Sequence, residues 1–131
     1  MVTDLAVRST MRYRITAKPG YLKADLFNRQ TAEETREFLS AVADECLQRR
    51  CYRVLISVHS SKPIFTVERY GLSSFIDLAM KHSGQFAVLA DSRESRIAQE
   101  YVVMVARLRG VNVRAFRDEG LAAQWLKETR Q

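Results

Sequence analysis

Hydrophobic and polar residues alternate in two short stretches near the start of the chain, residues 13–17 and 21–27. Alternation with a period of two is typical of β-strands, and Lys18-Pro19-Gly20 between the stretches is a turn signal. The pattern therefore predicts an antiparallel β-hairpin. Lys23 and Asp25 fall on one face of its second strand, so we expect that face to be partly solvated.

Two segments with apolar residues at helical spacing predict the long helices. Thr31-Ala32-Glu33-Glu34 has the sequence of a capping box. The helix after it is expected to place six residues on its apolar face: Phe38, Leu39, Val42, Ala43, Cys46 and Leu47. A capped helix over residues 93–108 is expected to use Ile97, Ala98, Tyr101, Val102 and Val105. Val103 and Met104 fall off that stripe and are candidates to line a homodimer interface or an apolar ligand groove; the alternative is that they are isolated exposed hydrophobic residues.

Apolar runs and short amphipathic segments complete the pattern. Buried strands are expected at residues 52–58 and 86–90, and the last strand at residues 111–116. A helix is expected within residues 66–82, and a short one after Asp118. The order β-β-α-β-α-β-α-β-α implies right-handed crossovers. The predicted class is α/β, with a five-stranded mixed, mostly parallel sheet, an N-terminal β-hairpin and four helices on its two faces.

The 131 residues correspond to one domain, 1–131, in which we expect residues 1–11 to form a flexible arm. No apolar run approaches the roughly 20 residues of a membrane span, and residues 1–10 lack a signal-peptide core. Cys46 and Cys51 have a C-x4-C spacing that matches neither a zinc site nor a C-x-x-C redox motif. Two unpaired thiols favour a reducing cytoplasm, and we expect no metal and no cofactor.

The net charge of +6 favours anionic partners at long range. The arginines are scattered in groups around residues 8–14, 49–53 and 107–117, without a run of like charge and without interleaved aromatics. Nucleic-acid binding is therefore less favoured than a solvated basic surface.

Several motifs resemble the SpoIIAA-like family of the STAS-domain superfamily. They are residues 86–89 followed by Asp91-Ser92, and the strand 113–116 followed by Asp118 and Ala122-x-x-Trp125-Leu126. The resemblance extends from about Arg12 to Lys127. It implies a five-stranded mixed sheet and a regulatory module that works by binding a protein partner. Binding of apolar ligands is a further role suggested for related domains.

The resemblance also identifies a departure at the switch segment. Anti-sigma-factor antagonists of this superfamily carry Asp-Ser-x-Gly, and phosphorylation of its serine switches partner binding. The matching Gly-Leu here is Gly71-Leu72, and the Asp and Ser positions hold Glu68 and Arg69. Because a serine kinase cannot phosphorylate arginine, we expect an interaction module that is not switched in the usual way.

A candidate binding loop follows the third predicted strand: His59, Ser60, Ser61 and Lys62. Ligands of open α/β sheets bind at the carboxyl ends of the strands, where this loop lies. His59 can titrate near neutral pH, and the two serines are candidates for hydrogen bonding or phosphorylation. The alternative is an ordinary polar loop that ends at Pro63.

A second candidate follows the next strand, where Ser92, Arg93 and Arg96 begin a helix. Such a helix start can hold a phosphate or carboxylate. The alternative is a helix cap with a solvated first turn, because Asp91 and Glu94 offset the positive charge. The chain has neither G-x-G-x-x-G nor a Walker lysine motif, which disfavours the usual kinds of nucleotide binding.

Three functions follow from these features. The first is a non-enzymatic interaction module, with a homodimer or protein partner on Val103 and Met104, joined by Leu78. The second is a binder of a small apolar or amphipathic ligand held between helices and sheet, which requires an internal pocket. The third is a hydrolase-like enzyme using His59 with Ser60 or Ser61, which requires a carboxylate within hydrogen-bond reach of the imidazole.

Overall fold

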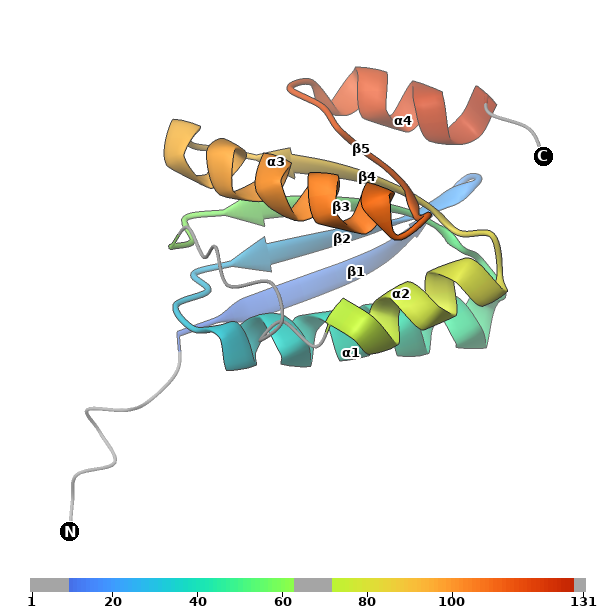
Figure 1. The fold of residues 1–131 in the computed structure, drawn as a ribbon, viewed down its shortest axis with the longest axis horizontal. Coiled ribbons are helices and arrows are strands. Elements are labelled where there is room, and N and C mark those ends of the chain that lie inside the picture. The colour runs from blue at the N-terminus through green and yellow to red at the C-terminus, as the bar shows by residue number, and fades with distance from the viewer. Residues whose placement is uncertain (1–9, 63–71, 129–131) are drawn as a thin grey trace, which may run out of the picture.

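The computed structural model describes residues 10–62 and 72–128. It contains the predicted elements in the predicted order: β1 Arg12–Lys18, β2 Tyr21–Phe27, α1 Ala32–Arg49, β3 Arg53–His59, α2 Leu72–Lys81, β4 Gln85–Ala90, α3 Arg93–Leu108, β5 Asn112–Ala115 and α4 Glu119–Glu128. The strands lie in chain order across one sheet (Figure 1). Strands β1 and β2 are antiparallel and all other neighbours are parallel. The α/β class and the mixed five-stranded sheet are confirmed.

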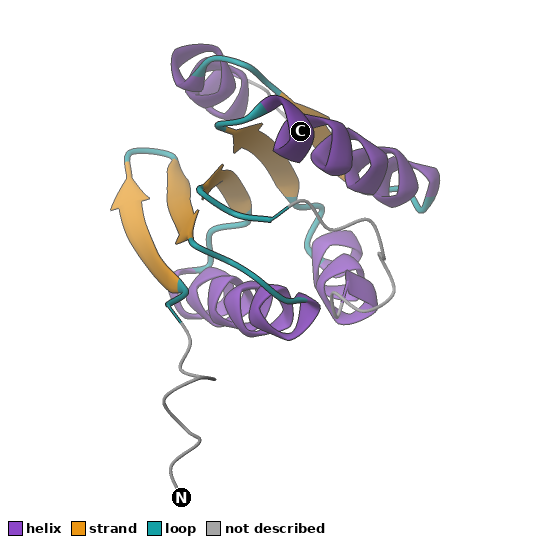
Figure 2. Cartoon of the chain, turned by 90° about the vertical axis from the view of Figure 1, so that its left-hand side faces the viewer, coloured by secondary structure: helices purple, strands orange, loops and turns teal. Residues whose placement is uncertain are grey.

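Helices cover both faces of the sheet, but unequally. Helices α1, α2 and α3 cover one face, and α4 alone packs on the other (Figure 2). The larger core lies under the three helices and includes Leu22, Leu26, Val54, Ile56 and Val88. The smaller one joins Leu55, Ala87 and Leu89 to Ala122 and Leu126 of α4.

The two long helices begin where their capping residues predict. The Thr31 side chain accepts a hydrogen bond from the Glu34 backbone N–H at 3.1 Å, and the Glu34 carboxylate accepts one from the Thr31 N–H at 3.3 Å. This reciprocal pair is the expected capping box of α1. Ser92 caps α3 by accepting from the Ser95 N–H at 3.1 Å.

The expected apolar face of α3 is wrong by part of a turn. Val103 is buried in the core, whereas Ile97 and Tyr101 are exposed. The residues of α3 that are fully buried are Ser95, Ala98, Val103 and Ala106. Apolar residues occupy more than half of this helix's circumference, so periodicity alone could not select the buried side. Val103 therefore cannot serve as a surface contact, while Met104 is exposed as expected.

Two further expectations need adjustment. Leu47, placed on the apolar face of α1, is exposed, and Asp25, expected on a solvated face, is buried.

Glu68, Arg69 and Gly71, the matches to the phosphoserine segment, lie outside the described residues. Cys46 is fully buried and Cys51 partly so, and both are free thiols. Among the described helices, none is long and apolar enough to cross a membrane.

Candidate functional site

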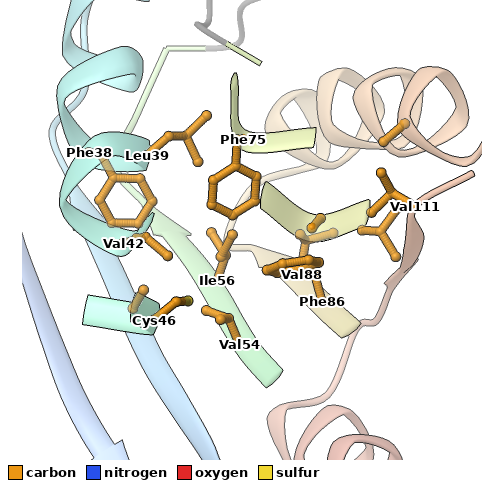
Figure 3. Packing of buried hydrophobic residues seen from close by; sticks show 14 of the residues in the cluster. Phe38, Leu39, Val42, Cys46, Val54, Ile56, Phe75, Phe86, Val88 and Val111 are labelled. Atoms are coloured by element: carbon orange, nitrogen blue, oxygen red, sulfur yellow. The ribbon is translucent and has the colours of Figure 1, made fainter. Parts of the chain in front are cut away.

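A cavity of about 120 Å³ lies between helices α1, α2 and α3 and the sheet. Each of these helices and four strands, β2 to β5, contribute apolar side chains to its wall, and Figure 3 shows several of them pointing toward one another. They include Phe38 and Leu39 of α1, Phe75 and Ile76 of α2, Ala98, Val103 and Ala106 of α3, and Ile56, Phe86 and Val88 of the sheet.

The size of the side chains on α3 accounts for this space. Ala98 and Ala106 are buried and turned toward the cavity, and each carries only one side-chain carbon. Opposite them, the rings of Phe75 and Phe86 pack against each other with centroids 5.0 Å apart. By the usual relation between void volume and stability, an empty cavity of this size costs on the order of 3 kcal/mol.

One end of the cavity is polar. It lies at the carboxyl ends of the parallel strands and is formed by Arg29, Thr35, Ser95 and Gln99. The Ser95 hydroxyl donates to the Ser61 carbonyl at 3.1 Å, and the Gln99 amide donates to the Leu89 carbonyl at 3.3 Å.

Thr35 differs from the other polar residues at this end. Its hydroxyl has no hydrogen-bond partner among the residues that the structure describes, although only 5% of the residue is exposed. Buried polar groups are nearly always paired, and an unpaired one costs about 1–3 kcal/mol. The cavity therefore combines an apolar wall with one hydroxyl available to a bound molecule.

The two candidate loops meet in a separate shallow hollow. Because β3 and β4 are neighbours, Ser60, Ser61 and Lys62 lie beside Ser92, and the hollow also contains Gln30, Asp91 and Glu94. The Ser60 backbone N–H donates to the Asp91 carboxylate at 2.9 Å. The Ser61 hydroxyl donates to the His59 carbonyl and accepts from the Arg29 N–H, both at 3.0 Å. These contacts fix the loops to one another.

The hollow does not favour an anion. Its described lining contains two carboxylates, Asp91 and Glu94, against the single ammonium group of Lys62. Arg93 is exposed, Arg96 is partly buried, and neither is among the described residues that line the hollow. The arrangement corresponds more closely to capped helix and loop ends than to a phosphate site.

The side chain of His59 lies on the sheet face that α4 covers only in part. Its Nε2 is 3.2 Å from Oδ1 of Asp25 on β2 and 3.0 Å from Oγ of Ser57 on β3. Phe27 stacks on the imidazole with centroids 4.7 Å apart. Arg14 of β1 lies 3.9 Å from the other Asp25 oxygen. The carboxylate that a hydrolase would require is thus present, on a residue that was not among the candidates.

The geometry of this cluster differs from a catalytic relay. A carboxylate only accepts hydrogen bonds, so Nε2 carries the proton that it donates to Asp25. Ser57 approaches the same nitrogen, whereas a Ser-His-Asp triad uses one ring nitrogen for each partner. No hydrogen bond joins the ring to Ser60 or Ser61 in the described part of the chain. The cluster ties β2 to β3.

Metal ligation has no support within residues 10–62 and 72–128, where no group of three His, Cys, Asp or Glu side chains is arranged to hold an ion. Compared with known proteins, the chain matches no protein-family model and no curated protein.

Proposed function

We propose that the protein is a non-catalytic binding module that takes a small amphipathic molecule into the cavity between α1, α2, α3 and the sheet. The observation that carries this proposal is the apolar cavity whose polar end includes the buried, unpaired hydroxyl of Thr35. The role corresponds to the apolar-ligand binding suggested for domains related to the SpoIIAA-like family, rather than to the protein-partner binding that the resemblance itself implies.

The volume limits the size of the ligand. An engineered protein cavity of about 150 Å³ accommodates benzene, so about 120 Å³ suits a compact apolar body no larger than roughly the six carbon atoms of benzene. The polar group of the ligand would point toward Thr35. Because the guanidinium of Arg29 lies at the same end, that group is a hydroxyl or an acceptor rather than a cation.

A simple probe should bind weakly but measurably. Filling the cavity recovers on the order of 3 kcal/mol, and one hydrogen bond to Thr35 adds about 1 kcal/mol. The sum corresponds to a dissociation constant of about 1 mM for a molecule such as phenol. The biological ligand would improve on this by a closer match of shape.

The test compares phenol with benzene, titrated into the full chain and followed by amide chemical shifts in NMR spectra. We expect both to perturb residues around the cavity and phenol to bind several-fold more tightly. Thr35→Val should remove the advantage of phenol and leave benzene binding unchanged. Thr16→Val, on the opposite sheet face, is the matched control and should change neither affinity.

A second part of the test uses variants in which a larger side chain fills the cavity. Ala106→Leu should weaken both probes at least tenfold, and Ala98→Val is the alternative if that variant does not fold, as judged by amide dispersion. Absence of binding by both probes to the wild type, or undiminished binding to a folded filled variant, would overturn the proposal.

A further inference from the structure

Helix α3 carries a continuous apolar stripe on its outer side. Ile97, Tyr101, Met104 and Leu108 are 51%, 42%, 51% and 80% exposed. They are four of the eight large hydrophobic residues exposed in the described part of the chain. The helix lies along the outside of the molecule (Figures 1 and 2), and the exposure of these four residues places them on its solvent side. An apolar surface of this kind marks an interaction site more often than isolated exposed residues do.

We propose that this stripe binds the same stripe of a second copy of the chain, with the two α3 helices antiparallel. The intervals between the four residues are four, three and four, which is the a/d spacing of a coiled-coil seam. A two-fold axis between residues 102 and 103 places Ile97 against Leu108 of the second copy. The same axis places Tyr101 against Met104 of the second copy, a favourable sulfur–aromatic pair.

The charges beside the stripe favour a second copy of the chain as the partner and an antiparallel orientation of its α3 helix. Glu100 and Arg107 are exposed, lie seven residues apart, and flank the seam on the same side. Neither forms an ion pair within the described part of the chain. In an antiparallel pair these g positions face each other, so Glu100 meets Arg107 of the second copy, twice by symmetry.

A parallel pair would lack this complementarity. There the g position of one helix faces the e position of the other, and the e position after Glu100 is Val105. The e positions Ala98 and Val105 are buried or half-buried against the chain's own core, so no charge from that side opposes the antiparallel contact. Arg93, one heptad before Glu100, falls beyond the paired length of the second helix.

The apolar surface continues past the end of α3. Met80 of α2 is exposed, and its side chain lies against Gly110, two residues after Leu108. The 16 residues of α3 span about 24 Å, which gives a contact at the small end of the range for protein interfaces. We therefore expect a dimer with a dissociation constant in the micromolar range.

Sedimentation of the full chain over concentrations up to about 500 µM tests the proposal. The wild type should shift from monomer to dimer, and Met104→Glu should remain a monomer. The matched control is Leu121→Glu on α4, which is 58% exposed on the other side of the molecule and should dimerise like the wild type. A wild type that stays monomeric throughout would overturn the proposal.

Charge reversal tests the direction of the helices. Glu100→Arg and Arg107→Glu each replace two attractive contacts by two repulsive ones, so each should weaken the dimer by about tenfold. The double variant restores complementary pairs and should recover the wild-type affinity. A dimer that is unaffected by the single reversals, or not restored by the double variant, would show that α3 does not pair in this way.

Discussion

Thr35 illustrates how one atom can indicate a function. Its hydroxyl lies in the first turns of α1, where threonine commonly bonds the carbonyl four residues back, yet the described structure gives it no partner. A group that costs stability in the free protein is understandable if a ligand satisfies it.

The first prediction concerns the stability of the free protein. Thr35→Val keeps the shape of the side chain and removes the unpaired hydroxyl, so it should raise the free energy of unfolding by about 1 kcal/mol in urea denaturation. Ser95→Ala should have the opposite sign and cost about 1 kcal/mol, because it removes the hydrogen bond to the Ser61 carbonyl. Loss of stability in Thr35→Val would indicate that the hydroxyl is already satisfied.

The second prediction concerns the two thiols. Burial raises the pKa of Cys46 to about 12, with smaller contributions from Cys51 and Glu45. At pH 8 Cys46 is therefore a neutral thiol, and iodoacetamide should modify the partly exposed Cys51 first. Peptide mass spectrometry over time measures both rates, and equal rates in denaturant provide the control. Equal rates in native buffer would contradict the assigned burial.

The same pKa shift has a defined effect on stability. The folded-state pKa of Cys46 lies above its unfolded value near 9.0, so folding favours the neutral thiol. The corresponding contribution to stability is complete below pH 9 and is lost as the pH rises toward 12.

At the scale of elements, α4 is the least supported part of the sheet's cover, because no other described helix lies beside it on that face (Figure 2). Leu126 and Ala122 are fully buried against β3 and β4. The Arg53 guanidinium donates to the Leu126 carbonyl at 2.6 Å, and Lys23 pairs with Glu119 at 3.0 Å.

The third prediction ranks these contacts. Leu126→Ala should lower the free energy of unfolding by about 3 kcal/mol, because it empties a fully buried site. Lys23→Ala should cost less than about 1 kcal/mol, since Glu119 is half exposed and water screens the pair. Urea denaturation of both variants provides the measurement, and a larger loss from Lys23→Ala would reverse the assignment of apolar packing as the main anchor of α4.

The elements themselves could be read from the sequence where local signals are strong. Thr31 and Glu34 specify the start of α1, and Ser92 specifies that of α3, because capping depends on residues three apart in the chain. The buried side of α3 could not be predicted from the sequence, because apolar residues such as Ile97 and Val103 occupy more than half of its circumference. Only the position of the sheet decides which of them is covered.

At the scale of the whole molecule, the sites depend on strand pairing. Asp25 and His59 are 34 residues apart and meet because β2 and β3 are parallel neighbours, with Asp25 opposite Ser57 in register. The alternation of residues along the strand predicts only that Asp25 lies on a polar face. The cavity requires three helices on one face, and its emptiness depends on small residues at Ala98 and Ala106, which no local signal distinguishes from ordinary helix formers.

Helix α3 lines the cavity with one side and exposes apolar residues on another. Val103 and Ala106 form part of the cavity wall, while Met104 and Leu108, one and two residues further along the helix, form part of the outer stripe. A molecule that displaces or stiffens this helix from inside changes the surface offered to a second copy. Thermodynamic linkage then requires reciprocity: if the ligand tightens the dimer by some factor, dimerisation tightens ligand binding by the same factor. If both proposals hold, helix α3 would couple the amount of bound ligand to the amount of dimer.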